Sequence, residues 1–278
     1  MSLNYSVLTT AFLLFLVSCA SVGDEKRSEQ KDENRIIPLL LDSLYDSYEV
    51  DGSFILLDLN NNQKSIYNES QIHTEFSPAS TFKICNSIIA LETGVVPDEN
   101  FIIKWDSVKW QVPNWNQDTD LTMAFRNSTV WYYQEVAKQI GSTKMQSWLN
   151  QFDYGNKNIG NEIDQFWLNG DLMISPIQQV DFLERILNRN LQISDRTYEI
   201  LDKIMTFDFS NTYEIKGKTG WGIVDNKDIG WFIGWIETDK TKYIFVNCIQ
   251  SRGPNDQFAK ARIEIAYEVF RKNGIIAE

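Results

Sequence analysis

Apolar and polar residues along the chain follow patterns that predict two groups of strands. Two apolar stretches near the start, 52–59 and 64–68, are typical of strands, and Asn60-Asn61-Asn62 between them predicts a turn. Three further strands are expected close together near the end of the chain, at 213–219, 228–238 and 242–250.

Helical spacing of apolar residues predicts most of the remaining elements. A mostly apolar helix is expected between Pro78, which suits a helix start, and Gly94, which suits a helix end. A short amphipathic helix is expected at 36–49, and a last helix at 258–273 with Gly274 as its stop. Further helices are expected in the middle of the chain, at 121–126, 129–140, 142–151, 176–188 and 194–206.

The order of these elements predicts the class of fold. Two strands, a helical middle part, three strands and a helix are typical of an α+β protein, here an αβ sandwich. We expect one central antiparallel sheet of about five strands, with the N- and C-terminal helices on one face and a helical lobe formed by the middle of the chain. No internal repeat or linker is visible after residue 36, so residues 36–278 are expected to form a single catalytic domain.

The N-terminal residues have the pattern of an export signal. Residues 1–19 contain an apolar run from Val7 to Val17, which is too short to span a bilayer as a mature helix. The run ends in Leu16-Val17-Ser18-Cys19, which resembles a bacterial lipobox and predicts lipidation of Cys19, although the first six residues lack Lys and Arg. The alternative is an ordinary secretory signal cleaved near Ala20. Residues 20–35 alternate in charge and predict a flexible tether.

Composition excludes several classes of function. The net charge is −12 and no basic stretch exists, so nucleic acid and an anionic membrane surface are not expected partners. The single histidine, His73, is interpreted as a strand or loop residue, and with only three cysteines no metal site is expected. Cys85 and Cys248 are interpreted as small buried residues rather than a disulfide. If the protein catalyses acid–base chemistry, Lys, Tyr or a carboxylate must perform it.

Ser80 and Lys83 form the first candidate for that chemistry. They are three residues apart, so the expected helix places both side chains on one face of its first turn. Apolar neighbours and the positive helix terminus disfavour the charged form of Lys83. A neutral amine beside a hydroxyl is a base and nucleophile pair. The pattern S-x-x-K is short, and alone it is also compatible with an ordinary helix start and a surface lysine.

A second motif, Lys218-Thr219-Gly220-Trp221, lies on the first of the late strands. Lys218 supplies positive charge, and Thr219 can donate to a carboxylate. Gly220 allows a substrate backbone to approach the strand. The N–H groups of Trp221 and Ser80 can form an oxyanion hole together. A K-T-G strand combined with S-x-x-K is the pairing found in serine enzymes that react with penicillin.

Taken in order, five motifs resemble those of the class D (oxacillinase-type) serine β-lactamases. They are P-A-S-T-F-K at 78–83, S-T-V at 128–130, Y-G-N at 154–156, W-L-N-G at 167–170 and K-T-G at 218–220, and the resemblance covers roughly residues 50–275. It implies the fold that serine β-lactamases share with penicillin-binding transpeptidases. It also implies hydrolysis of penicillin-type antibiotics, which would confer resistance.

The resemblance implies a role for each catalytic residue. Ser80 attacks the lactam carbonyl, and Ser128 relays a proton to the lactam nitrogen. Lys83 is N-carboxylated by CO2, which is the only added group expected, and then acts as general base with Lys218 nearby. The indole N–H of Trp167 holds this carbamate.

Other residues are implied to bind the substrate or support the site. Val130 and Leu168 enclose the carbamate and limit water, and Tyr154 and Asn156 are structural. Arg262 matches the family's arginine for the substrate carboxylate, and Arg252 is the competing candidate.

Two alternatives share this fold. A penicillin-sensing domain would be acylated and deacylate slowly, but such sensors are attached to membrane segments and an H-E-x-x-H protease, and this chain has one histidine. A D-Ala-D-Ala transpeptidase or carboxypeptidase would carry S-x-N or Y-x-N. We expect an exported protein on the periplasmic side, anchored by lipid, with the outer membrane favoured because Ala20 follows Cys19. The sequence gives no indication of oligomeric state.

Overall fold

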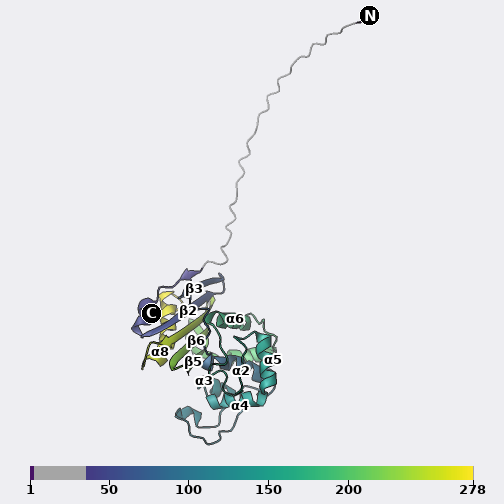
Figure 1. The fold of residues 1–278 in the computed structure, drawn as a ribbon, viewed down its shortest axis with the longest axis vertical. Helices are drawn as coiled ribbons and strands as arrows, with labels where there is room; N and C mark the ends of the chain where they lie inside the picture. The colour runs from purple at the N-terminus through teal and green to yellow at the C-terminus, as the bar shows by residue number, and fades with distance from the viewer. Residues whose placement is uncertain (3–35, 278) are drawn as a thin grey trace. The chain divides into compact units, whose positions relative to one another are not determined.

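Seven strands form one mixed sheet in the computed structural model of the chain, which describes residues 1–2 and 36–277 (Figure 1). The order across the sheet is β1-β3-β2-β7-β6-β5-β4. The strands are β1 Ile37–Pro38, β2 Val50–Asp58, β3 Gln63–Tyr67, β4 Thr206–Phe209, β5 Tyr213–Val224, β6 Lys227–Thr238 and β7 Lys242–Ser251. The expected signal segment, apart from its first two residues, and the expected tether lie outside the described residues.

The five strands expected from the sequence form the centre of this sheet. They pair antiparallel, and the β5–β6 hairpin closes through Asp225 and Asn226, which have φ of 51° and 61° as a tight two-residue turn requires. The expectation of about five strands was short by two. β1 pairs parallel with β3 at one edge, and β4 pairs with β5 at the other. Both added strands, of two and four residues, are too short to be recognised from an apolar pattern.

The terminal helices cover one face of the sheet, as expected. α1 (Asp42–Ser47) and α8 (Phe258–Lys272) pack against it through a core that includes Phe54, Phe232 and Phe270. The helix expected at 36–49 is shorter than predicted, because its first residues form β1 and a connection.

The opposite face carries the helical lobe, as expected. The helix predicted from Pro78 begins with a 3-10 turn, η1 (Ala79–Phe82), and continues as α2, which is buried along almost its whole length. The helices of the lobe are α2 Lys83–Glu92, α3 Leu121–Arg126, α4 Val130–Ile140, α5 Ser142–Phe152, α6 Pro176–Leu187 and α7 Asp195–Ile204, with a 3-10 turn, η2, at Pro113–Trp115.

The structure also shows where Cys85, Cys248 and His73 lie. Cys85 and Cys248 are buried and free, which confirms their interpretation as small buried residues. His73 lies in an exposed turn. Within the described part of the chain, no helix is long and apolar enough to span a bilayer.

Candidate active site

Ser80 and Lys83 meet at the junction of η1 and α2. The Lys83 Nζ donates to Ser80 Oγ over 2.9 Å, and the two residues are only 1% and 8% exposed, respectively. Ala79, directly before the serine, has φ of 46°, a left-handed conformation that costs a non-glycine residue about 1–2 kcal/mol. The surrounding fold therefore holds a strained backbone directly before the serine.

The surroundings of Lys83 suppress its charge. Burial, and secondarily the positive charge of Lys218, lowers the pKa of Lys83 well below its ordinary value of 10.5. Its Nζ also lies 5.2 Å from the centre of the Tyr133 ring on α4. A neutral amine hydrogen-bonded to a serine hydroxyl can act as a base toward that hydroxyl.

The K-T-G strand β5 lies directly against the turn that carries Ser80. A Cβ on Gly220 would come within 3.1 Å of both the Pro78 carbonyl oxygen and Thr81 Cγ2. Gly220 therefore permits close packing of η1 on β5, whereas the sequence analysis gave substrate approach as its reason. This packing brings Ser80 and the backbone of Trp221 to the same edge of the sheet.

Lys218 points from β5 into the helical lobe. Its Nζ donates to the Thr219 carbonyl over 3.0 Å and lies 5.7 Å from the centre of the Phe125 ring. Burial, followed by the charge of Arg262, lowers the pKa of Lys218 to about 7. Lys218 thus shares a buried region with Lys83 and the end of α3.

The structure separates the two arginines considered for carboxylate binding. Arg252 is held by two carboxylates, with distances of 2.8 Å to Asp46 and 2.8 Å to Asp51. Arg262 on α8 instead donates to the carbonyl oxygens of Gly220 (2.8 Å) and Ala259 (3.1 Å). Among the described residues it pairs with no carboxylate, and burial lowers the pKa of Arg262 to about 10, so it stays cationic at neutral pH.

A series of side-chain contacts holds the Trp221 ring next to Arg262. The guanidinium lies 5.3 Å from the centre of the Trp221 ring, which is 47% exposed. The Trp221 indole donates to Asp228 over 2.7 Å, and Asp228 accepts from the Ser251 hydroxyl over 3.2 Å. The K-T-G motif predicts a role only for the Trp221 backbone N–H, and no motif in the sequence indicates Asp228.

Trp167 presents a buried donor without an acceptor. Its Nε1 is fully buried and makes no hydrogen bond with any residue that the structure describes. Its ring packs 5.5 Å from that of Phe82, the residue next to Lys83. Buried N–H groups are nearly always satisfied, so this donor fits an additional oxygen acceptor at the start of α2. The adjacent Leu168 is half-buried.

Ser128 and Val130 lie where α3 gives way to α4. Ser128 has φ of 55° and its N–H donates to the Phe125 carbonyl over 3.2 Å. Val130 is the half-buried first residue of α4. Because Phe125 contacts Lys218, this connection lies beside β5.

Tyr154 and Asn156 hold the segment that carries Trp167. Tyr154 is buried and packs edge-on against Phe82 and Phe182. The Asn156 side chain donates to the Asp171 carbonyl over 2.9 Å and accepts from the Met173 N–H over 3.1 Å. Both residues therefore support the loop from 157 to 173.

Sequence reasoning missed two residues that join these parts. The Trp231 indole donates to the Ser77 carbonyl over 2.9 Å, and the Ser77 hydroxyl donates to the Trp167 carbonyl over 2.9 Å. They connect β6, the serine turn and the 157–173 loop. Ser77 precedes the P-A-S-T-F-K motif directly, which is the one signal that could have indicated it.

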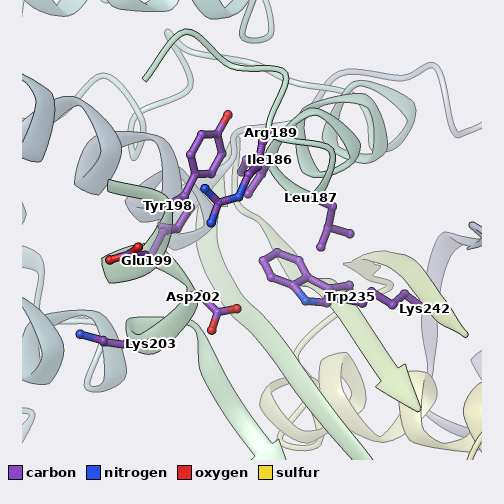
Figure 2. Close-up of a pocket in the computed structure, with 10 residues that line it drawn as sticks. Ile186, Leu187, Arg189, Tyr198, Glu199, Asp202, Lys203, Trp235 and Lys242 are labelled. Atoms are coloured by element: carbon purple, nitrogen blue, oxygen red, sulfur yellow. The ribbon is translucent and has the colours of Figure 1, made fainter. Parts of the chain in front are cut away.

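A separate cavity of about 460 Å³ lies between α6, α7 and the end of β6 (Figure 2). None of the candidate residues lines it. Its cations are paired, since Arg189 contacts Asp195, Lys203 contacts Glu99 and Lys242 contacts Glu237. In the described ranges, no group of three His, Cys, Asp or Glu side chains gathers as a metal site would require.

Several known proteins are similar to this chain in sequence and in fold. Residues 52–272 match the family of the penicillin binding protein transpeptidase domain. A probable β-lactamase from Bacillus subtilis, YbxI, is 37% identical over 228 residues, which cover 82% of this chain and 83% of the relative. The crystal structure of a class D β-lactamase from Sebaldella termitidis superposes with a TM-score of 0.85 at 34% identity and covers 88% of this chain and 100% of the other.

The chain belongs to the class D β-lactamase family. The C-terminal domain of the Bacillus licheniformis BlaR penicillin-receptor is also similar, with a TM-score of 0.82, 30% identity, and coverage of 87% of this chain and 98% of that one. The predicted family and the transpeptidase-type fold are thus confirmed. The similarity to the receptor domain means that the rate of deacylation distinguishes a class D hydrolase from a sensor.

Proposed function

We propose that this class D β-lactamase opens the lactam ring of penicillin-type antibiotics through an acyl-enzyme on Ser80. The observation that carries the proposal is the 2.9 Å contact between Lys83 Nζ and Ser80 Oγ, in a site where the charge of the lysine is suppressed. Arg262, which pairs with no carboxylate of the described residues, and the Thr219 hydroxyl can bind the substrate carboxylate.

Each step of the proposed reaction uses particular residues of the site. Ser80 Oγ loses its proton to the base at Lys83 and bonds to the lactam carbonyl carbon. The N–H groups of Ser80 and Trp221 stabilise the negative oxygen. The carbon–nitrogen bond then breaks, and Ser128, with Lys218 on the neighbouring strand, relays the proton held at Lys83 to the nitrogen, which frees the base again. A water that loses a proton to the same base hydrolyses the Ser80 ester and restores the hydroxyl.

We further propose that Lys83 carries a carbamate formed with CO2. The lowered pKa of Lys83 supports this, because only a neutral amine reacts with CO2. The unsatisfied Trp167 Nε1 fits the added oxygens, and the half-buried Val130 and Leu168 would limit water around them. When present, the carbamate supplies an oxygen base for both steps.

We also propose export to the periplasmic side and a lipid anchor on Cys19, with the outer membrane favoured. The motif Leu16-Val17-Ser18-Cys19 and the charged segment 20–35 support this arrangement. A single acyl chain binds a membrane weakly, so stable anchoring needs the several chains that a bacterial lipoprotein carries.

Ring opening of a chromogenic cephalosporin tests the proposed site. Ser80→Ala should abolish it, and Arg262→Ala should lower kcat/KM about tenfold or more, as expected for loss of hydrogen bonds to a charged group. Much of that loss should fall in KM, because the carboxylate is remote from the reacting carbonyl. Arg252→Ala is the matched control, since Arg252 is already paired with Asp46 and Asp51. A large loss in Arg252→Ala with none in Arg262→Ala would reassign carboxylate binding.

A further inference from the structure

A groove of about 450 Å³ extends from the K-T-G strand toward the edge of the sheet. It begins at Lys218 and Thr219 and continues between β4 and the ends of α3 and α7. Neither Trp221 nor Leu168 lines it. The groove is therefore continuous with one side of the proposed active site only.

Two phenylalanines on β4 line this groove. Phe207 and Phe209 are 39% and 74% exposed, although large aromatic side chains are normally buried. Phe207 is held in place because its ring packs 4.7 Å from that of Phe232. Together they offer an aromatic surface beside the site.

The groove has one exposed cation that pairs with no carboxylate of the described residues. Arg126, exposed at the end of α3, makes no ion pair or hydrogen bond with any residue in the described part of the chain. Lys203 contacts Glu99 over 3.2 Å. The acidic member of the lining, Asp208, already accepts hydrogen bonds from Tyr213, Tyr267 and its neighbour's N–H. An unpaired guanidinium in a chain of net charge −12 is available to an anion.

The proposed reaction indicates which part of the substrate would lie in the groove. The lactam carbonyl lies between the N–H groups of Ser80 and Trp221, while Lys218 and Ser128 serve the leaving nitrogen. Since the groove starts at Lys218 and leads away from Trp221, it lies on the side of the leaving nitrogen and the ring fused to it.

We infer that this groove is a subsite for the substituent on the leaving-group side of the substrate, and that it favours aromatic substituents carrying an acidic group. Phe207 and Phe209 contact the aromatic ring, and Arg126 pairs with the acidic group at the rim. The inference rests on the proposed function and names a substrate class for it: cephalosporins with an acidic heteroaryl group at C3.

The test uses three cephalosporins that share one acylamino side chain and differ at C3. The first carries acetoxymethyl, the second an acidic heteroarylthiomethyl group, and the third a cationic pyridiniomethyl group. The wild-type chain should prefer the second over the third in kcat/KM. Arg126→Ala should reduce the ratio of the second to the first about two- to fivefold, as expected for an exposed ion pair. Arg126→Glu should reverse the order of the second and third.

The aromatic wall and the controls complete the test. Phe209→Ser should lower kcat/KM for both heteroaryl substrates relative to the first about three- to tenfold. Lys144→Ala, which removes an exposed cation from α5, should leave all ratios unchanged.

Ratios unchanged in both Arg126→Ala and Phe209→Ser would overturn the subsite. So would a dimer that Phe209→Ser dissociates without changing the ratios, because a second copy would then occupy β4. A wild-type chain that opens a penicillin but none of the three cephalosporins would overturn the subsite alone, whereas a chain that opens no penicillin either would contradict the proposed function.

Discussion

At the scale of single residues, the site combines a suppressed charge with an unsatisfied donor. Lys83 is buried beside Ser80, and a second buried lysine, Lys218, lowers the pKa of Lys83 further. Trp167 places an indole N–H in the same core, where no described residue accepts a hydrogen bond from it. Both features have measurable consequences.

Trp167→Phe tests the unsatisfied donor. The phenyl ring keeps an aromatic side chain against Phe82 but removes the N–H, so the proposed carbamate on Lys83 should be lost more readily. We expect activity to fall about tenfold and to recover with added bicarbonate, in line with a hydrogen bond to a charged group. Trp148→Phe on α5 is the control and should not alter the bicarbonate response. Activity indifferent to bicarbonate in the wild type and in Trp167→Phe, with no carbamate signal from labelled CO2 in NMR, would contradict the carbamate.

Burial of the Lys218 charge should lower the free energy of unfolding by an amount that depends on pH. Its pKa is about 7 in the fold and 10.5 ordinarily, so below pH 7 the lysine is charged in both states and the folded state bears the full cost of burial. As the pH rises from 7 to 10.5, the folded protein holds a neutral lysine while the unfolded chain stays protonated, and this cost disappears.

Lys218→Met should therefore raise the free energy of unfolding by several kcal/mol at pH 6 and by clearly less at pH 9. Urea denaturation at both pH values measures the difference. Lys144→Met, at an exposed position, is the control for a general effect of methionine. A gain that is equal at pH 6 and pH 9 would mean that the pKa of Lys218 is not lowered in the fold.

At the scale of elements, the site depends on three segments that pack together, the serine turn, β5 and the 157–173 loop. The serine turn η1 packs on β5, and the 157–173 loop is fixed by Tyr154, Gly155 and Asn156. Gly155 has φ of +53°, and a Cβ there would lie 2.1 Å from the Met173 carbonyl oxygen. The loop that carries Trp167 thus requires glycine at this position.

Gly155→Ala should lower the melting temperature and displace this loop. Gly94→Ala is a matched control, because Gly94 also has a positive φ of +70° but nothing within 4 Å of its Cβ position. We expect Gly94→Ala to cost about 1–2 kcal/mol from backbone strain alone, and Gly155→Ala to cost more and to make activity bicarbonate-dependent. Equal losses in stability for the two variants would show that the contact with Met173 is unimportant.

The helices and strands also differ in how well the sequence could predict them. The five long strands and α8 have clear apolar patterns, and the motifs indicated Ser80, Lys83 and Lys218 as neighbours. The four-residue β4 is too short for its pattern to be recognised, and its first residue fell in the helix expected at 194–206, so the groove beside it was missed. The bonds from Trp231 to Ser77 and from Ser77 to Trp167 join residues up to 154 positions apart, and only the folded chain reveals them.

At the scale of the whole molecule, charge is distributed unevenly. The chain carries a net charge of −12, yet Lys218 and Arg126 line the groove and Arg262 contacts the neighbouring Gly220 on β5. This local excess of positive charge can attract anionic substrates to an otherwise acidic protein, an effect that salt weakens.

The proposed lipid anchor on Cys19 would determine where the whole molecule is located. Cys19→Ser should move the exported protein from the membrane fraction to the soluble periplasmic fraction. Fractionation of both forms, with N-terminal sequencing of the mature wild type, measures this. A wild-type protein that is already soluble, with a mature N-terminus beyond residue 19, would contradict lipidation and support conventional cleavage near Ala20.

The lifetime of the Ser80 adduct tests the central claim most directly. The purified chain is mixed with a penicillin, quenched at intervals, and examined by mass spectrometry of the intact protein and of the peptide containing Ser80. Hydrolysis predicts an adduct on Ser80 that forms and disappears within seconds while many equivalents of opened penicillin accumulate. A stoichiometric adduct that persists for hours without turnover, or an adduct on another residue, would contradict the account.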